Sequence, residues 1–378
     1  MDLSQLRQQI DTIDRQIVNL YEERMDVSRQ VAEYKIETGK KVFDKQREQE
    51  KIAGVKALTH NDFNSHGVEE LFEQIMSMSR KLQYQLLAAH GSEGRLPFIG
   101  VEELETDCAR VVYQGAEGSY SQAAMRRFFG ENVNAFHVET FRDAMSAIDE
   151  GSADFAVLPI ENSNAGSVVE VYELLKKYNI YIARRIKIEV NHCLAALPGT
   201  QLSDIKCVFS HEQGIQQCSS FIHQHNLTAH SYSNTAAAAE YVAQSDPNQH
   251  FAAICSNLGA QIHGLQILSD HISNIDENYT RFICISKKPQ YSKEDNIISI
   301  SFSLPHTVGS LYRMLTKFSV YGINMQKIES KPIGNKNFDI MFYLDFTGNL
   351  KDENVSALLN DLAADLLQFK YLGNYIEI

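Results

Sequence analysis

The sequence has no apolar run close to the roughly 18 residues that a membrane-spanning helix needs. It does not open with the basic-then-apolar pattern of a secretory signal, but with a charged pattern typical of a helix. Its six cysteines are widely spread over 378 residues and form no C-x-x-C pair. Such spacing in a chain of this length indicates reduced thiols, so we expect a cytoplasmic protein without disulfides.

The sequence also has no excess of positive charge and no recognisable metal-ligand motif. The formal net charge of −13 argues against non-specific binding to nucleic acid or to an anionic membrane surface. His223 and His225 are two residues apart and belong to no ligand pattern with cysteine or acidic residues, so we expect neither a metal nor a cofactor. Apolar residues make up 44% of the chain, which excludes a disordered protein and allows two or three folded domains.

The first 90 residues have the pattern of an all-helical domain. Apolar residues recur at steps of three and four from Leu3 to Tyr34, and no glycine or proline interrupts them before Gly39. A helix of about 33 residues would be about 50 Å long, which is too long for a small domain and calls for another packing partner. Two shorter helices are predicted near residues 44–58 and 66–89.

Arg24 occupies a position of this apolar seam. A charge there is costly unless it is paired, so Arg24 either reaches solvent and fixes the register, or it belongs to an anion site inside the bundle. Lys35 follows eleven residues later, about 20° around the helix axis, and can reach the same pocket. Arg7 lies about 25 Å before Arg24 along the axis and about 100° around it, so it can join such a site only from a second copy.

These positions, with others on the two shorter helices, resemble the all-helical chorismate mutase domain over about residues 3–88. By this resemblance Lys35, Glu48 and Gln83 are catalytic, and substrate is bound by five residues: Arg7 of a partner chain, Arg24, Asp44, Arg47 and Ser79. The residue types suit a pericyclic rearrangement, which needs a clamped dicarboxylate and donors at the ether oxygen where negative charge develops. Arginine suits the carboxylates, and Lys35 with a protonated or hydrogen-bonding Glu48 and Gln83 pair suits the ether oxygen.

From about residue 109 to residue 286, short β-rich runs alternate with helical patterns. This alternation predicts a largely parallel α/β sheet with helices on its faces, in two lobes with a cleft between them. Polar clusters follow the predicted strands, where ligands of open α/β folds bind. Helix N-caps alone would account for about half of the Ser and Asn residues in them.

Four of these clusters closely resemble prephenate dehydratase: G-x-x-G-S-x-S at 115–121, P-I-E-N-S at 159–163, S-H at 210–211 and T-R-F at 280–282. The resemblance implies two lobes like those of a periplasmic binding protein, with Thr280 as the catalytic donor to the leaving hydroxyl. We expect a neighbour such as Glu161 to assist this hydroxyl, which has no suitable pKa by itself. The resemblance assigns substrate binding to Asn162, Ser163, Ser210, Gln217, Arg281 and Phe282.

The last region, residues 296–378, has the order strand, helix, strand, strand, helix, strand of a ferredoxin-like α+β unit. The strands are predicted at 297–304, 323–332, 338–346 and 371–378, and the helices at 308–320 and 355–369, with a turn at 334–337. This unit resembles an ACT domain, which implies a phenylalanine site between two copies at Gly309, Ser310, Leu311, Glu329, Ser330, Lys331 and Pro332. The family usually has Arg at the position of Lys331, and the alternative to a sensor is a plain dimerisation domain.

The sequence thus predicts a multidomain chain with a mutase domain at 1–90, a dehydratase domain at 109–286 and a regulatory domain at 296–378. The function implied is conversion of chorismate to prephenate and of prephenate to phenylpyruvate, with phenylalanine as effector, in a homodimer or larger oligomer. Two alternatives remain open. The dehydratase could act on arogenate, or the chain could be a non-catalytic amino-acid-binding regulator.

Overall fold

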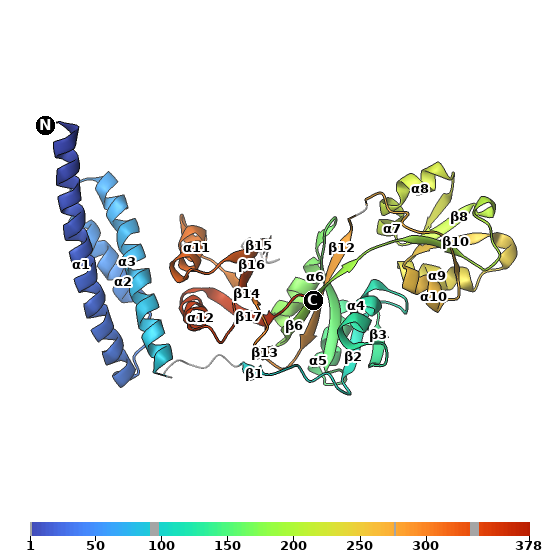
Figure 1. Ribbon diagram of the computed structural model, residues 1–378, viewed down its shortest axis with the longest axis horizontal. Coiled ribbons are helices and arrows are strands. Elements are labelled where there is room, and N and C mark those ends of the chain that lie inside the picture. The colour runs from blue at the N-terminus through green and yellow to red at the C-terminus, as the bar shows by residue number, and fades with distance from the viewer. Residues whose placement is uncertain (1, 91–97, 276, 333–339) are drawn as a thin grey trace. The chain divides into compact units, whose positions relative to one another are not determined.

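The structure is a computed structural model that describes residues 2–90, 98–275, 277–332 and 340–378. The chain divides into two compact units (Figure 1). One consists of Met1–Phe98 with Asn296–Tyr371, and the other of Ile99–Asp295 with Leu372–Ile378. Among the described helices, none combines the length and the apolar character needed to cross a membrane.

Three helices form the N-terminal part of the first unit. They are α1 (Leu3–Thr38), α2 (Lys45–Lys56) and α3 (Asp62–Ala89). Side chains cap each start: Asp2 accepts from the backbone of Gln5, Asp44 from that of Arg47, and Asn61 from that of Asn64. The cap at Asn61 begins α3 four residues before the predicted start, so Gly67 lies inside this helix.

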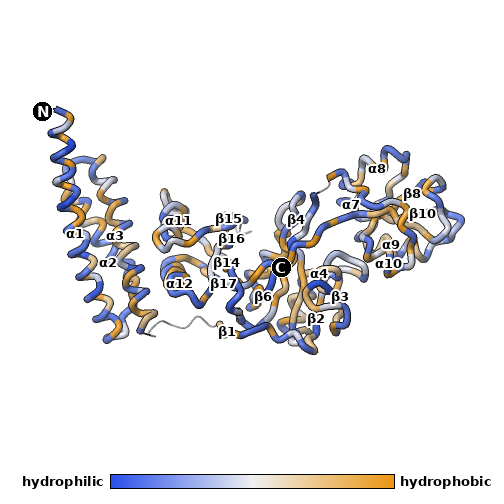
Figure 2. Tube along the Cα trace, in the orientation of Figure 1, coloured by the Kyte–Doolittle hydropathy of each residue, from blue (hydrophilic) through white to orange (hydrophobic). Residues whose placement is uncertain are grey.

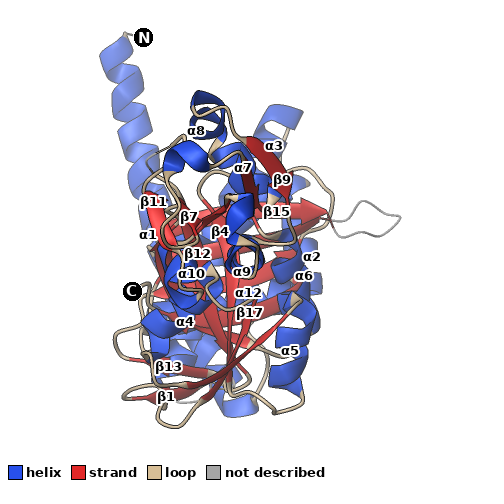
Figure 3. Ribbon diagram, turned by 90° about the vertical axis from the view of Figure 1, so that its right-hand side faces the viewer, coloured by secondary structure: helices blue, strands red, loops and turns tan. Residues whose placement is uncertain are grey.

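Helix α1 has 36 residues, which gives it a length of about 54 Å. Its N-terminal end extends past α2 and α3 (Figure 3), and orange apolar positions alternate with blue polar ones along it (Figure 2). The apolar seam is exposed there: Leu6, Ile10, Ile13 and Ile17 each expose two fifths or more of their surface. Only in its second half does α1 bury residues, Ser28 and Ala32.

The C-terminal part of the first unit has the predicted βαββαβ order. Its elements are β14 (Ile297–Ser303), α11 (Ser310–Tyr321), β15 (Met325–Pro332), β16 (Ile340–Thr347), α12 (Glu353–Asp365) and β17 (Leu367–Tyr375). The strands form one sheet in the order β15-β16-β14-β17, and β16 runs antiparallel to both of its neighbours. This is the ferredoxin-like arrangement expected from the sequence.

One boundary in this part differs from the prediction. We expected a helix to residue 369, but α12 ends at Asp365 and β17 begins at Leu367. The apolar residues Leu366, Leu367 and Phe369 fit a helical face as well as a strand, which is why periodicity misplaced the junction. The predicted turn at 334–337 lies outside the described residues.

The first lobe of the second unit is built on a sheet in the order β3-β2-β4-β12-β6. Helices α4 (Tyr120–Phe129), α5 (Phe141–Asp149) and α6 (Val169–Lys177) pack against it. A short strand β5 (Gly166–Ser167) pairs with β4, and β1 (Ile99–Val101) pairs with β13 (Gln290–Ser292). The strands of the main sheet are β2 (Arg110–Gln114), β3 (Asn134–Val138), β4 (Phe155–Asn162), β6 (Tyr181–Glu189) and β12 (Tyr279–Ser286).

The second lobe is built on a sheet in the order β11-β7-β10-β8-β9. Its strands are β7 (Cys193–Ala196), β8 (Cys207–Ser210), β9 (Thr228–Ser231), β10 (Phe251–Cys255) and β11 (Gln266–Ser269). Its helices are α7 (Glu212–Gln217), α8 (Ser219–Gln224), α9 (Thr235–Ala243) and α10 (Asn257–Ile262), and two 3-10 turns lie at Leu202–Asp204 and Pro247–Gln249.

Both sheets are mixed, so the prediction of largely parallel sheets was wrong. In the first lobe β2 is parallel to β3 and β4, but β12 is antiparallel to β4 and β6. In the second lobe β8 is parallel to β9 and β10, while β7 is antiparallel to β10 and β11. The reason lies in how the chain passes between the two lobes. The chain leaves the first lobe after β6 and returns at β12, so each lobe gains strands that no βαβ unit generates (Figure 1).

Candidate active sites

A cavity of about 330 Å³ opens among α1, α2 and α3, which we call the helical cavity. Seven of the eight residues that the sequence assigned to one site line it: Arg24, Lys35, Asp44, Arg47, Glu48, Ser79 and Gln83. Its lining carries five cationic and two acidic side chains, once Lys51 and Arg80 are included. In a chain of net charge −13 this local positive balance favours a small anion.

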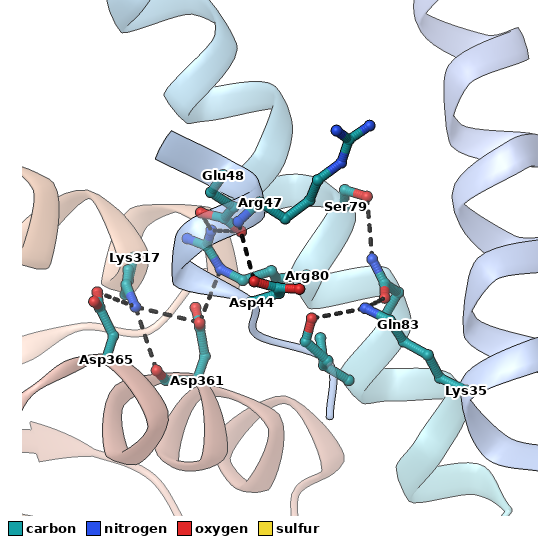
Figure 4. Close-up of polar contacts among 11 residues, drawn as sticks. Lys35, Asp44, Arg47, Glu48, Ser79, Arg80, Gln83, Lys317, Asp361 and Asp365 are labelled. Carbon is teal, nitrogen blue, oxygen red and sulfur yellow. Dashed lines mark hydrogen bonds and ion pairs between the residues drawn. The ribbon is translucent and has the colours of Figure 1, made fainter. Parts of the chain in front are cut away.

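Lys35 lies at the centre of a hydrogen-bonded group in the helical cavity (Figure 4). Its ammonium donates to Gln83 Oε1 at 3.0 Å and to the Val42 carbonyl at 2.8 Å. Gln83 Nε2 in turn donates to Ser79 Oγ at 3.3 Å. Burial lowers the pKa of Lys35, and the nearby carboxylates of Asp44 and Glu48 offset part of that effect. Lys35 and Gln83 therefore hold donors at one wall of the cavity.

Arg24 is the one cavity residue with an unsatisfied buried donor in the described chain. Its Nη1 atom is buried without a hydrogen-bond partner. Burial lowers the pKa of Arg24, and the fields of Tyr21 and Glu48 oppose that effect. A buried guanidinium nitrogen that lacks a partner carries a desolvation cost, which an anionic ligand in the cavity would relieve.

Glu48 is held by a residue that the sequence analysis missed. Arg80 of α3 donates from Nη1 to both carboxylate oxygens of Glu48, each at 2.6 Å. In this pair both oxygens of Glu48 accept charge-assisted hydrogen bonds. The expected role of Glu48 at the ether oxygen stays a prediction. Arg80 carried no sequence signal, because a charged residue on an amphipathic helix is ordinary.

Arg7 is not brought to the helical cavity. It lies near the exposed start of α1, 17 residues before Arg24, which is about 25 Å along the axis. The structure of one chain thus leaves Arg7 outside the group, as expected for a residue that acts in a second copy.

In the second unit, Thr280 and Asn162 are paired residues on adjacent strands. They face each other in the register of β12 and β4, and Asn162 Nδ2 lies 3.0 Å from Thr280 Oγ1. The same nitrogen lies 2.9 Å from Asn278 Oδ1, and Asn162 Oδ1 accepts from the backbone of Asn164 and Ala165. An amide that donates to the Thr280 oxygen leaves the hydroxyl proton available to a ligand.

Glu161 does not assist Thr280 in this structure, so that expectation is corrected. Glu161 pairs in register with Arg281, one position along both strands, and side chains at successive positions point to opposite faces. Arg281 Nη1 binds Glu161 at 3.0 Å, and its Nε binds Glu377 at 3.0 Å. Asn162 is instead the neighbour of the Thr280 hydroxyl, and Arg281 has two carboxylate partners within its own unit.

A cavity of about 310 Å³ lies where loops of the first lobe meet α7 of the second, and we call it the inter-lobe cleft. Six side-chain amides dominate its lining, and no charged side chain is among the residues that line it in the described chain. These lining amides belong to Asn164, Gln213, Gln216, Gln217, Asn274 and Asn278. Asn278 is 2% exposed, and its Nδ2 atom has no partner among the described residues.

Gln217 is the predicted binding residue that reaches the inter-lobe cleft directly. Its Oε1 atom lies 2.9 Å from His192 Nε2, and His192 Nδ1 lies 3.2 Å from the Tyr120 hydroxyl. Burial lowers the pKa of His192, and the hydrogen bond to Gln217 offsets part of that effect. His192 and Tyr120 follow no recognisable motif, so sequence reasoning missed both.

Three other predicted binding residues have structural partners. Ser163 Oγ accepts from the Tyr279 backbone at 3.0 Å. Ser210 is fully buried and donates to the Ile254 carbonyl at 2.7 Å. Phe282 is 2% exposed and packs in the apolar core of the first lobe. Burial gives Ser210 and Phe282 packing roles, so a direct contact with substrate does not follow from their positions.

In the glycine turn before α4, the backbone N–H and carbonyl of Gly118 both have hydrogen-bond partners within the protein. Gly118 N donates to Gln122 Oε1 at 2.7 Å, and the Gly118 carbonyl accepts from Ser256 of the other lobe at 2.7 Å. A Cβ on Gly118 would come within 2.5 Å of Gly259, so a side chain there would force the lobes apart. These contacts fit a tight turn that joins the lobes better than an anion site.

The residues assigned to effector binding lie on two elements of the βαββαβ part. Gly309, in the left-handed conformation with φ +78°, precedes α11, which begins with Ser310 and Leu311. Residues 329–332 end the edge strand β15, where Lys331 binds Glu329 at 2.7 Å.

Comparison with known proteins gives two family matches. The chorismate mutase type II model matches residues 6–84, and the prephenate dehydratase model matches residues 111–290. A bifunctional chorismate mutase/prephenate dehydratase of Enterobacter agglomerans is 30% identical over 98% of this chain and 95% of its own length. The arogenate dehydratase/prephenate dehydratase 2 of Arabidopsis thaliana is 35% identical over 70% of this chain and 72% of its own length.

Among solved structures, a prephenate dehydratase from Arthrobacter aurescens in complex with L-Phe is similar to this chain. It is 28% identical with a TM-score of 0.65, and the match covers 71% of this chain and 89% of that one.

Proposed function

The chain belongs to the family of bifunctional chorismate mutase/prephenate dehydratases, and from this premise we propose that it catalyses two consecutive steps of phenylalanine biosynthesis. In the first step chorismate rearranges to prephenate, and in the second prephenate loses CO₂ and water to give phenylpyruvate. The observation that carries the first step is the convergence of seven assigned residues on one cationic cavity.

The helical cavity suits the rearrangement because this reaction needs no nucleophile and no obligatory proton transfer. The substrate is a dicarboxylate, and we assign its two carboxylates to the guanidinium groups of Arg24 and Arg47, with Arg7 of a second copy. Lys35 and Gln83 are the donors for the ether oxygen, where negative charge develops in the transition state. Gln83 must rotate for this, because its Oε1 faces Lys35 and its Nε2 faces Ser79.

Glu48 takes a different role from the two donors. Both of its oxygens accept hydrogen bonds from Arg80, so we give it an accepting role. The ring hydroxyl of chorismate is a donor of matching chemistry. We therefore assign Glu48 to the orientation of the ring rather than to the ether oxygen.

The exposed seam of α1 supports a homodimer in which the first half of the helix packs on a second copy. A face with Ile10, Ile13 and Ile17 open to water is unfavourable in an isolated chain, because each such side chain gains about 1.5–3 kcal/mol when it is fully buried. The same pairing is what would carry Arg7 to the partner's helical cavity.

For the second reaction, Thr280 is the proposed donor to the leaving hydroxyl. The C–C bond to the carboxylate breaks and its electron pair completes the aromatic ring. The ring C–O bond breaks as the leaving hydroxide accepts a hydrogen bond from Thr280 and takes up a proton from solvent to become water. Asn162 supports this role by donating to the Thr280 oxygen. A cleft lined by neutral amides also fits, because a cation paired with the departing carboxylate would oppose its loss as CO₂.

We assign the βαββαβ part to the ACT fold and propose that it binds phenylalanine as a feedback effector. The complex of the Arthrobacter aurescens dehydratase with L-Phe supports this assignment. Gly309 would let the ligand approach the backbone closely, and residues 329–332 would come from a second copy. Titration calorimetry with phenylalanine, and with tyrosine as control, tests it: heat with phenylalanine alone supports the sensor, and no heat removes it.

The experiment that tests the whole function is a coupled assay that starts from chorismate and follows the absorbance of phenylpyruvate. We expect both steps to proceed with the purified chain. Arogenate is the matched alternative substrate, since the Arabidopsis thaliana relative is named for both activities. A preference for arogenate over prephenate would mean that the second activity is that of an arogenate dehydratase. No turnover of chorismate would overturn the proposed mutase activity.

A further inference from the structure

Arg80 is a buried charged residue of the helical domain. It lies on α3 directly after Ser79 and one turn before Gln83, and it is 8% exposed. Its Nη1 atom holds both oxygens of Glu48, and its guanidinium lies over the Phe43 ring at 5.5 Å from the centroid. A buried guanidinium with these partners has little freedom to turn, so it fixes the position of the Glu48 carboxylate.

The other side of Arg80 binds the C-terminal βαββαβ part of the same unit. Nε donates to Oδ1 of Asp361 on α12 at 3.0 Å, and Asp361 is fully buried. The same Oδ1 accepts from Lys317 of α11 at 3.2 Å, and Lys317 also binds Asp365 at 3.0 Å. Figure 4 shows the resulting row of ion pairs, which runs from Glu48 through Arg80 and Asp361 to Lys317 and Asp365.

The electrostatics favour a permanently charged Arg80. Burial opposes its charge, but the attraction of Asp361 and Glu48 outweighs burial and raises the pKa of Arg80. Arginine is also the cation that can serve two carboxylates from separate nitrogens, whereas lysine offers one ammonium group. If Asp361 lost its charge, Arg80 would keep Glu48 as its main partner and would be free to shift toward it.

Arg80 also forms part of the wall between two cavities. With Glu48 and Met76 it lines the helical cavity, and the same three residues line a second cavity of about 800 Å³. Residues of α2, α3 and α11 and the start of β17 surround this second cavity. A displacement of Arg80 would therefore move Glu48 relative to a ligand in the helical cavity.

We propose that Arg80 is a positioning residue of the mutase site, and that Asp361 holds Arg80 so that the C-terminal part sets the place of the Glu48 carboxylate. This inference rests on the proposed mutase function and deepens it. It makes the rearrangement depend on a side chain of the C-terminal part that does not line the helical cavity. The Glu48, Arg80 and Asp361 side chains act as one unit.

The test uses the full chain with Asp361→Asn, which keeps the shape of the side chain and removes its charge. We expect mutase kcat to fall by about tenfold or more, because a small misplacement of a polar group is costly in the transition state. The KM for chorismate should change less, and dehydratase turnover should stay within twofold as the sign that the chain is folded. Glu73→Gln is the matched control, since Glu73 of α3 also pairs with α11, through Arg313, but does not touch Glu48.

A double-mutant cycle separates positioning from a merely structural role. In the presence of Glu48→Gln, the Asp361→Asn change should reduce mutase kcat no further, because it acts through Glu48. Effects that multiply independently, or an Asp361→Asn variant within twofold of wild type, would overturn the inference. Arg80→Lys should recover part of the kcat that Arg80→Met loses. If the wild-type chain does not rearrange chorismate, the proposed function itself fails. If the wild-type chain is active but Asp361→Asn does not change mutase kcat, only this inference fails.

Discussion

At the scale of single residues, pairing decides what each polar group of the helical cavity can do. Glu48 is held by Arg80 and accepts, Lys35 and Gln83 supply donors, and Arg24 has a buried nitrogen without a partner. The residue types were readable from the sequence, because a charge in an apolar seam is unusual. Their partners were not, since Arg80 has the appearance of any charged residue on an amphipathic helix.

Arg24→Ala should lower mutase kcat/KM by about 10³-fold or more, because it removes a carboxylate clamp inside a desolvated site. Dehydratase activity should be unchanged, since Thr280 and the inter-lobe cleft belong to the other unit. Arg29→Ala is the matched control: it removes an exposed arginine of the same helix that does not line the cavity. Mutase turnover near the wild-type level in Arg24→Ala would refute the assignment.

Lys35 should give the mutase an alkaline limb. It must be protonated to donate, so activity is present below its pKa and lost as pH rises through it. Because burial lowers this pKa from the ordinary value, kcat/KM should begin to fall at a lower pH than an exposed lysine would give. Lys35→Arg should move the limb upward, since arginine stays charged. A pH profile of kcat/KM that is the same in both proteins would contradict the role of Lys35.

Thr280→Val keeps the shape of the residue but removes the hydroxyl beside Asn162. We expect phenylpyruvate formation from prephenate to fall by about 10²-fold or more, while prephenate formation from chorismate is unchanged. Thr280→Ser retains the hydroxyl and should keep most of the activity. Equal rates in the Val and Ser variants would show that the hydroxyl does not act as the donor.

At the scale of elements, local patterns predicted most helices and strands but not how strands pair. The alternation of β-rich and helical runs predicted for the α/β region is present in the structure. However, β12 runs antiparallel to β4 because the chain returns from the second lobe there. The same pairing explains why Asn162, and not the expected Glu161, is the neighbour of the Thr280 hydroxyl. Register puts Asn162 opposite Thr280 and Glu161 opposite Arg281, and register depends on contacts between strands more than a hundred residues apart.

The prediction at the scale of elements concerns the apolar seam of helix α1. Ile13→Glu places a carboxylate in the exposed apolar seam and should convert the dimer to a monomer in sedimentation experiments, with loss of mutase activity. Gln8→Glu adds the same charge on the opposite face of α1 and should leave the dimer intact. A stable dimer with Ile13→Glu would mean that this seam is not the contact.

At the scale of the whole molecule, the sequence predicted three consecutive domains, whereas the structure joins the first and third regions in one unit. Ion pairs such as that between Arg80 and Asp361, 281 positions apart, contribute to this joining. No sequence pattern pairs residues at such a distance. The two proposed sites nonetheless lie in separate units, since the helical cavity belongs to one and the inter-lobe cleft to the other.

The most direct test of a mutase site built from two copies is complementation between two inactive chains. Arg7→Ala and Arg24→Ala chains are co-expressed with different tags, and the hybrid dimer is isolated by both tags. One of its two sites then has every wild-type residue, so we predict about half of the wild-type mutase activity, with neither parent variant active. A hybrid as inactive as its parents, or an Arg7→Ala chain that rearranges chorismate at the wild-type rate, would contradict the account.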